Sequence, residues 1–143
     1  MNDSRDPILV QLVSKGIDVG QLQSFIADPD VGAHGWFHGV TRRRTGDKIT
    51  QILSYEAHES MAISELNRLA REATERFELT RLVIVHRLGI VPVGEASVVI
   101  GCSSPHRKQV FAALPWLMDH LKQDVPIWKQ ETFVDGSSEW VHR

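Results

Sequence analysis

Three segments of the chain concentrate positively charged side chains, the residue type that binds or transforms an anion. The first segment is Arg42-Arg43-Arg44, which runs into Gly46-Asp47 and is therefore expected to form a turn. A guanidinium group binds phosphate or carboxylate through a planar fork of N–H donors. For any single arginine of this segment, however, a solvated turn without a ligand is the simpler explanation.

The second segment covers residues 103–107 and ends in His106 and Arg107. Ser104 followed by Pro105 predicts a helix start, with Ser104 as the N-cap. Backbone N–H groups at a helix start attract anions, whereas positive side chains there oppose the helix dipole at a cost of about 0.3 kcal/mol or more. An anionic ligand would offset that cost, but ordinary surface placement explains His106 and Arg107 equally well.

The third segment covers residues 121–129 and contains Lys122 and Lys129. Lys122 is expected in the last turn of a helix, where a cation is favourable without any function. Lys129 follows Ile127 and Trp128 on an expected strand, and desolvation by these neighbours would favour the neutral amine that accepts a proton. The competing and simpler explanation is that Lys129 extends its charged end to solvent.

Other reactive side chains fit less well. His34 and His38 have the spacing of metal ligands on a helix, but the glycines and Trp36 around them predict a strand, so no metal site is expected. Cys102 is the one cysteine, which excludes an internal disulfide and a cysteine metal cage, and its place at a strand end suits a small apolar filler. The chain contains no P-loop and no GxSxG motif.

Two long helices are expected to position these segments. The first covers residues 60–77 and carries an apolar stripe of Ala62, Leu66, Leu69, Ala73 and Phe77. The second follows Ser104 and includes Pro115, which removes one backbone hydrogen bond and predicts a kink. A shorter helix is expected after Asp18, which can cap it.

The remaining regular segments have the patterns of strands. They cover residues 8–13, 33–40, 49–55, 82–86, 96–100 and 127–134. Within residues 49–55, alternation predicts one shared face for Ile49, Gln51, Leu53 and Tyr55. Strands mixed with a few helices, without regular βαβ alternation, predict an α+β fold.

The length predicts one domain over residues 1–143, and the single cysteine fits the reducing cytoplasm, which is the expected location. An apolar content of 42% is sufficient for one core, and a net charge of −2 gives no general attraction to nucleic acid or membrane. No apolar run approaches the ~20 residues of a membrane helix. Residues 1–6 are polar and lack the apolar core of a secretion signal.

Seven short blocks, taken in order, resemble the large, catalytic subunit of molybdopterin synthase, the MoaE family. The blocks are Gly32-Ala33 with Phe37 to Arg42, Tyr55 to His58 with Met61-Ala62, His86 to Gly89, Val93 to Glu95, Ser104 to Arg107, Leu121 to Glu131, and Trp140-Val141. They extend over residues 8–141, nearly the whole chain. Each block alone is weak evidence, whereas the ordered and spaced set is highly specific.

This resemblance implies an α+β fold of the hammerhead type, with a mixed sheet and two long helices. It implies a sulfurtransferase that converts cyclic pyranopterin monophosphate to molybdopterin by installing the dithiolene sulfurs. The sulfur donor is a thiocarboxylate on the Gly-Gly tail of a ubiquitin-like, MoaD-type small subunit. The large subunit is expected to form a homodimer within a heterotetramer. No cofactor or metal is implied, because the sulfur nucleophile arrives already activated.

The resemblance also assigns roles to residues. Lys122 and Lys129 match the catalytic lysines, and Arg42 matches a substrate-binding basic residue. His106 and Arg107 match the pair that receives an anionic group of the pterin. Phe37 and Met118 match residues that line the channel for the partner's tail. These roles agree with the chemistry, because phosphate and thiocarboxylate are both anions.

Two other functions remain open from the residues themselves. One is a non-catalytic module that binds an anionic phosphorylated ligand through Arg42, His106 and Arg107. The other is a purely structural partner of a ubiquitin-like protein. Retention of both Lys122 and Lys129 favours the enzyme, because a binding module needs positive charge but not two lysines at those positions.

Overall fold

The computed structural model describes residues 5–141, so most of the polar N-terminal segment lies outside the described residues. The elements, in chain order, are β1 (Ile8–Val13), α1 (Val19–Ile26), β2 (Ala33–Val40), β3 (Arg44–Thr45), β4 (Lys48–Ala57), α2 (Glu59–Arg76), β5 (Arg81–Arg87), β6 (Gly89–Pro92), β7 (Ala96–Ser104), α3 (Arg107–Asp124), β8 (Ile127–Phe133) and β9 (Ser138–Val141). The expected combination of strands with two long helices is confirmed, as is the short helix capped by Asp18.

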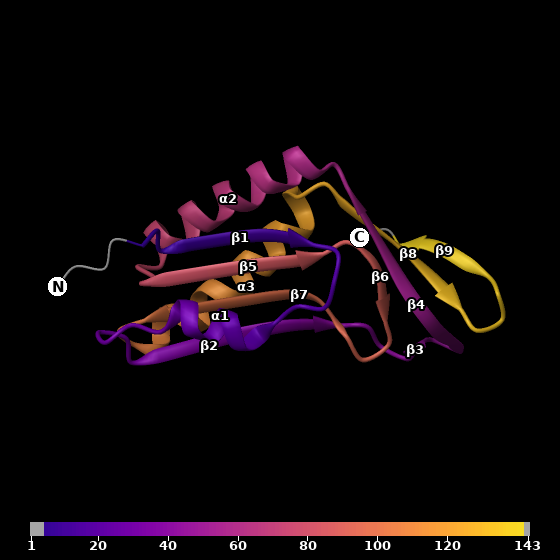
Figure 1. Ribbon diagram of the computed structural model, residues 1–143, viewed down its shortest axis with the longest axis horizontal. Helices are drawn as coiled ribbons and strands as arrows, with labels where there is room; N and C mark the ends of the chain where they lie inside the picture. The colour runs from indigo at the N-terminus through magenta and orange to yellow at the C-terminus, as the bar shows by residue number, and fades with distance from the viewer. Residues whose placement is uncertain (1–4, 142–143) are drawn as a thin grey trace.

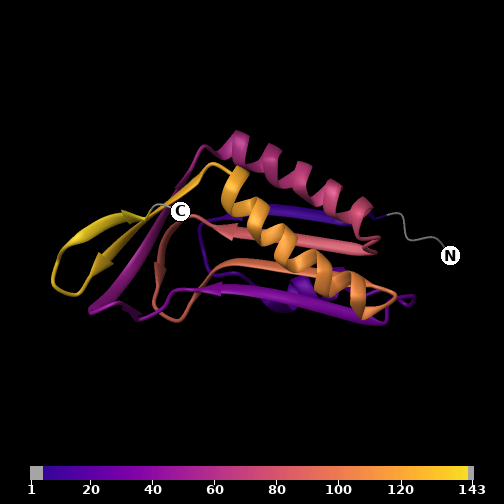
Figure 2. The same ribbon diagram turned by 180° about the vertical axis from the view of Figure 1, so that it is seen from behind.

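The first sheet has the strand order β1-β5-β7-β2. Strand β1 pairs in parallel with β5, and the other neighbours are antiparallel. Helix α1 covers one face, and α2 and α3 cover the other (Figures 1 and 2). Because both faces are covered, the alternate residues of β5 and β7 pack into two apolar clusters, one on each side of the sheet. This arrangement confirms the α+β class.

The second sheet extends from one end of the first (Figure 1). Its order is β3-β4-β8-β9, and β6 pairs with β4 on the edge opposite β8. A register shift between Thr50 and Ile52 interrupts the alternation of β4, so that Thr50, Leu53 and Tyr55 are buried. The expectation that Ile49 and Gln51 share a face with Tyr55 was therefore wrong: a bulge turns the strand at this point, and Ile49 remains 36% exposed.

Helix α2 carries the expected stripe, since Ala62, Leu66, Leu69 and Ala73 are all buried. Its N-cap is His58, whose Nδ1 accepts a hydrogen bond from the backbone N–H of Met61.

Among the described residues, no helix is long and apolar enough to span a membrane.

Helix α3 begins later than the sequence predicts. Ser104 is not its N-cap, because Ser104 belongs to β7 and pairs with Ala33 of β2. The N-cap is His106, and the Ser104 hydroxyl donates to the His106 carbonyl. Pro115 lies within α3 on its exposed side, and the helix continues through it to Asp124. Water can reach the carbonyl that Pro115 leaves without an N–H partner.

The contact between α3 and β2 depends on Gly35. A Cβ atom at Gly35 would lie 1.9 Å from Cγ1 of Val110 and 3.1 Å from Cδ1 of Leu114. The helix therefore sits directly on the backbone of the strand, as expected for a Gly-rich strand that is closely approached.

Replacing Gly35 by alanine should lower the free energy of unfolding by about 1–3 kcal/mol, because a methyl group must displace Val110 or α3 itself. Urea denaturation of the two proteins measures the difference. The matched control is Gly16→Ala, since a Cβ at Gly16 meets no atom within 4 Å. Equal loss of stability in both variants would contradict the proposed importance of the α3–β2 contact.

Candidate active site

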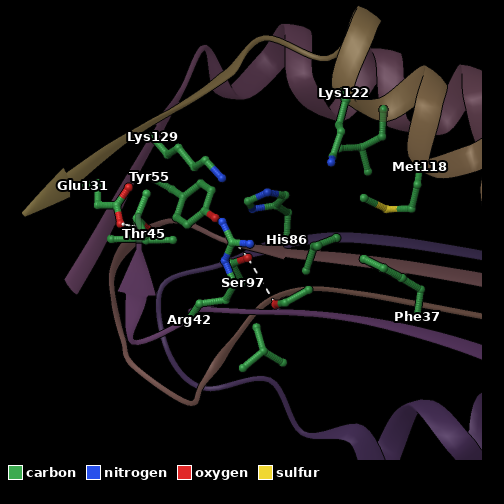
Figure 3. Close-up of a pocket in the computed structure, with 15 residues that line it drawn as sticks. Phe37, Arg42, Thr45, Tyr55, His86, Ser97, Met118, Lys122, Lys129 and Glu131 are labelled. Atoms are coloured by element: carbon green, nitrogen blue, oxygen red, sulfur yellow. Dashed lines mark hydrogen bonds between the residues drawn. The ribbon is translucent and has the colours of Figure 1, made fainter. Parts of the chain in front are cut away.

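A cavity lies where the two sheets meet the C-terminal end of α3 (Figure 3). Its volume is about 160 Å³. Its lining residues come from β2, β3, β4, β5, β7, α3, β8 and the turn after β2: Phe37, Gly39, Val40, Arg42, Thr45, Leu53, Tyr55, His86, Ser97, Val98, Met118, Leu121, Lys122, Lys129 and Glu131. Segments distant in sequence thus converge on one space.

The cavity contains most of the residues that the sequence singled out. They are Phe37, Arg42, Met118, Lys122 and Lys129. His106 and Arg107 do not line it and lie exposed at the other end of α3. Lys122 lies fifteen positions after Arg107 in the helix, and at 1.5 Å per residue this places their backbones about 22 Å apart. One chain therefore does not bring the two groups of cations together.

The apolar part of the cavity is built on β2 and α3. Phe37 faces α3, and Gly39 makes room beside the ring: a Cβ at Gly39 would lie 3.3 Å from Cε2 of Phe37 and 2.7 Å from Cγ1 of Val98. Met118 lines the cavity from α3 (Figure 3). The cavity wall therefore includes a thioether and an aromatic ring.

Lys129 reaches the cavity because of the alternation of β8. Ile127, Lys129 and Glu131 share the inner face of the strand, whereas Trp128 lies on the opposite face and is 53% exposed. The expectation that both Ile127 and Trp128 desolvate Lys129 was therefore wrong for Trp128. Across the pair β4–β8, Lys129 lies directly opposite Tyr55, whose side chain also lines the cavity.

The other two cations are held at the ends of elements. Lys122 lies in the last turn of α3, where the helix dipole favours a positive charge. Arg42 follows β2, and the backbone just before it is fixed on both sides: the N–H of Thr41 donates to the carbonyl of Glu95 at 3.1 Å, and the carbonyl of Thr41 accepts from the N–H of Gly94 at 2.9 Å. Arg42, Lys122 and Lys129 all point toward the cavity (Figure 3).

Glu131 is a buried carboxylate of the site that the sequence did not indicate as functional. Its Oε2 accepts hydrogen bonds from the hydroxyls of Thr45, at 2.6 Å, and Thr50. These bonds connect β8 to β3 and β4, the hairpin that follows Arg42. The one signal in the sequence was the two-residue spacing from Lys129, which places both residues on the same face of a strand.

A second polar group missed by the sequence analysis comprises Tyr55, His86 and Ser97. The Tyr55 hydroxyl donates to Oγ of Ser97 at 3.1 Å. The Ser97 hydroxyl in turn donates to the carbonyl of Gly39 at 3.3 Å. The rings of Tyr55 and His86 meet edge to face, with centroids 5.0 Å apart. The signal for His86 was a polar residue that continues the alternation of Leu82 and Ile84.

Cys102 and the histidines of β2 take no part in the cavity. Cys102 is fully buried, and burial raises the pKa of its thiol to about 12, which agrees with its prediction as an apolar filler. His34 and His38 lie on a strand, as expected. Within residues 5–141, no group of three or more His, Cys, Asp or Glu side chains could hold a metal ion.

Comparison with known proteins gives one consistent result. The family model described as MoaE protein matches residues 12–124. A molybdopterin synthase catalytic subunit from Culex quinquefasciatus is 42% identical over 134 residues, which cover 92% of this chain and 85% of the relative. One from Drosophila melanogaster is 43% identical over 92% of this chain, which spans only 36% of that longer protein.

A solved structure agrees with the sequence relatives. The crystal structure of molybdopterin synthase from Staphylococcus aureus includes a chain that is 35% identical and superposes with a TM-score of 0.87, covering 92% of this chain and 96% of that one. Family model, relatives and fold therefore lead to the same assignment, and this chain belongs to the MoaE family of molybdopterin synthase catalytic subunits.

Proposed function

We propose that this chain, as one domain, is the sulfur-transferring subunit of a molybdopterin synthase and that the cavity is its active site. The observation that carries the proposal is the convergence of Arg42, Lys122 and Lys129 with Phe37 and Met118 on one cavity. A site for two anionic reactants needs fixed positive charge, and a site for an extended tail needs a narrow apolar passage. The cavity holds three cationic side chains, and Phe37 and Met118 form an apolar part of its wall. A cytoplasmic location suits a chain whose one cysteine is a buried thiol.

The proposed sulfur donor is a MoaD-type, ubiquitin-like subunit that ends in a Gly-Gly thiocarboxylate. Its tail would pass Phe37 and Met118 and bring its anionic end to the lysines. Glycine suits such a passage because it carries no side chain. Ordering a flexible tail costs entropy, which docking of the folded body of the partner must offset.

The proposed acceptor is cyclic pyranopterin monophosphate, with Arg42 among the groups that bind its phosphate. The thiocarboxylate sulfur attacks a carbon of the acceptor, the bond from that carbon to oxygen breaks, and negative charge develops on the departing oxygen. Water then hydrolyses the resulting thioester, which leaves the sulfur on the acceptor and a carboxylate on the tail. An ammonium group fixed in a cavity stabilises that charge without reorganising solvent. Lys122 and Lys129 would supply this stabilisation and would also move the protons that accompany loss of the ring oxygen.

His106 and Arg107 fit this proposal if a second copy of the chain supplies them. They lie about 22 Å along α3 from Lys122 within one chain. In a two-fold symmetric homodimer, a contact between one region of the first protomer and another region of the second occurs twice. The start of α3 in each protomer can therefore complete the cavity of the other. A homodimer that binds one small subunit at each cavity would be the expected heterotetramer.

Lys122→Ala and Lys129→Ala should each reduce single-turnover formation of dithiolene product by about 100-fold or more, because losing one charge-stabilising group costs about 3 kcal/mol. The assay combines the protein with a thiocarboxylated partner and the cyclic precursor. Lys15→Ala is the control, since Lys15 is exposed and outside the cavity. Near-normal rates in either cavity variant, with folding intact, would remove that lysine from the mechanism.

If the parent protein binds the precursor but forms no product, the non-catalytic binding module is favoured over the enzyme.

Mixing two inactive variants tests the shared site. Lys122→Ala homodimers and Arg107→Ala homodimers should each be inactive. Random exchange makes about half of the dimers mixed, and each mixed dimer has one intact cavity, so activity should recover to about a quarter of the parent value. Absence of recovery after proven subunit exchange would place His106 and Arg107 outside the partner's active site.

Deleting the last two glycines of the partner should stop catalysis but only weaken docking, because the folded body of the partner supplies most of the binding. Light scattering should give the mass of a homodimer for this chain alone and the mass of two plus two chains with the partner. A monomer that ignores the partner at micromolar concentration would contradict the model.

A further inference from the structure

His86 is a buried histidine in the wall of the cavity. It lies near the end of β5, on the face that Leu82 and Ile84 present to the helices, and it is only 2% exposed. An apolar residue would satisfy that packing position at no polar cost. A buried imidazole instead requires partners for both of its nitrogens, so its presence at the cavity wall calls for an explanation in terms of polar contacts.

The backbone determines which nitrogen of His86 carries the proton. Nδ1 lies 2.8 Å from the carbonyl oxygen of Arg87. A carbonyl can only accept, so Nδ1 must be the N–H donor in this contact. In the neutral ring, Nε2 then carries a lone pair and is an acceptor.

The ring is also held from a second side. Its edge-to-face contact with Tyr55 has an interplanar angle of 67°, and the Tyr55 hydroxyl is fixed in turn by its bond to Ser97. Rotating the imidazole would break the bond to Arg87 and the ring contact together. Both constraints keep one orientation of Nε2 relative to the cavity.

Three positively charged side chains face the part of the cavity that contains His86, and each can donate a hydrogen bond to an acceptor. Lys122 approaches from α3, Lys129 from β8 and Arg42 from the turn after β2. Glu131, the carboxylate of the cavity, accepts through Oε2 from Thr45 and Thr50. A second proton on His86 would add a fourth positive charge beside three cations. The neutral ring adds no charge and leaves Nε2 as an acceptor, and His86 lines the same cavity as these cations (Figure 3).

We infer that His86 is a positioning residue for sulfur transfer: its neutral imidazole presents Nε2 as the acceptor that orients one lysine ammonium group of the cavity. This inference rests on the proposed function. An ammonium carries three N–H donors on a flexible stem, so its direction is undefined until one donor is fixed. Fixing one N–H on Nε2 directs the others toward the reacting oxygen, which converts a mobile charge into a preorganised one.

The first measurement is made on the protein without ligands and does not depend on activity. Nitrogen-15 NMR of the imidazole rings distinguishes a protonated from an unprotonated ring nitrogen. At pH 7, His86 should show a protonated Nδ1 and an unprotonated Nε2. The opposite tautomer, or protonation of both nitrogens, would overturn the inference.

Three substitutions then separate positioning from packing. His86→Phe keeps a ring against Tyr55 but removes both nitrogens, and it should lower kcat about tenfold or more while KM changes less than about twofold. His86→Gln can place an acceptor near the position of Nε2, and it should retain several times the kcat of His86→Asn, which can imitate only the Nδ1 donor. The comparison of Gln with Asn remains informative even if the Phe variant fails to fold.

The matched control is His120→Phe. His120 also has Nδ1 2.8 Å from a carbonyl oxygen, that of Trp116, but it does not line the cavity. Its kcat should stay within about twofold of the parent value. Parent-like kcat in folded His86→Phe, or equal kcat in the Gln and Asn variants, would overturn the inference. Failure of the proposed function would appear differently, as an inactive parent protein whose His86 tautomer is still the expected one.

Discussion

Helix α3 can lie on β2 only because the strand has no side chain at Gly35, where Val110 and Leu114 come down onto the backbone. That contact sets the register between helix and strand. From Gly35, two strand residues advance about 6.6 Å to Phe37, and from Leu114 one helical turn of four residues advances about 6 Å to Met118. The same contact therefore brings Phe37 and Met118 to one cavity, and the next turn adds Lys122.

The three cationic side chains in the cavity repel one another. Each therefore depends on the helix, turn or strand that carries it to keep it in place. Lys122 has the helix dipole, Arg42 follows a backbone fixed at Thr41, and Lys129 is fixed by the pairing of β8 with β4. The bonds from Thr45 and Thr50 to Glu131 keep the hairpin that follows Arg42 against the strand that carries Lys129. The anionic reactants proposed above would relieve the repulsion that remains.

Local patterns in the sequence were sufficient for the elements but not for the cavity. The stripe of α2 and the apolar run of β5 are properties of neighbouring residues, and both were predicted correctly. The start of α3 was misplaced because pairing with Ala33 keeps Ser104 in β7, a competition that no local signal reveals. The predicted alternation of β4 was wrong at its bulge for the same reason, because the bulge belongs to the pairing of β4 with β8 and no local signal reveals it.

The same distinction between local and long-range information separates the site residues that were predicted from those that were missed. Resemblance to a family located Arg42, Lys122 and Lys129, whereas the residues alone left a solvated turn and a snorkelling lysine as the simpler explanations. Tyr55, His86 and Glu131 were missed because each is one residue of an ordinary strand. Only pairing between segments that lie far apart in the sequence, such as Tyr55 with Lys129, turns them toward a common space.

Helix α3 carries positive charge at both ends, with Arg107 at its start and Lys122 in its last turn. The dipole favours the charge at Lys122 and opposes the charge at Arg107, so the start of the helix is the end that gains more from an anion. In the proposed homodimer, that anion would be the substrate held in the partner's cavity. One helix would then serve two active sites, with its C-terminal end in one and its start in the other. In that assembly a displacement of α3 on β2 would disturb both sites, so the absence of a side chain at Gly35 would matter to the proposed dimer as well as to the core of one chain.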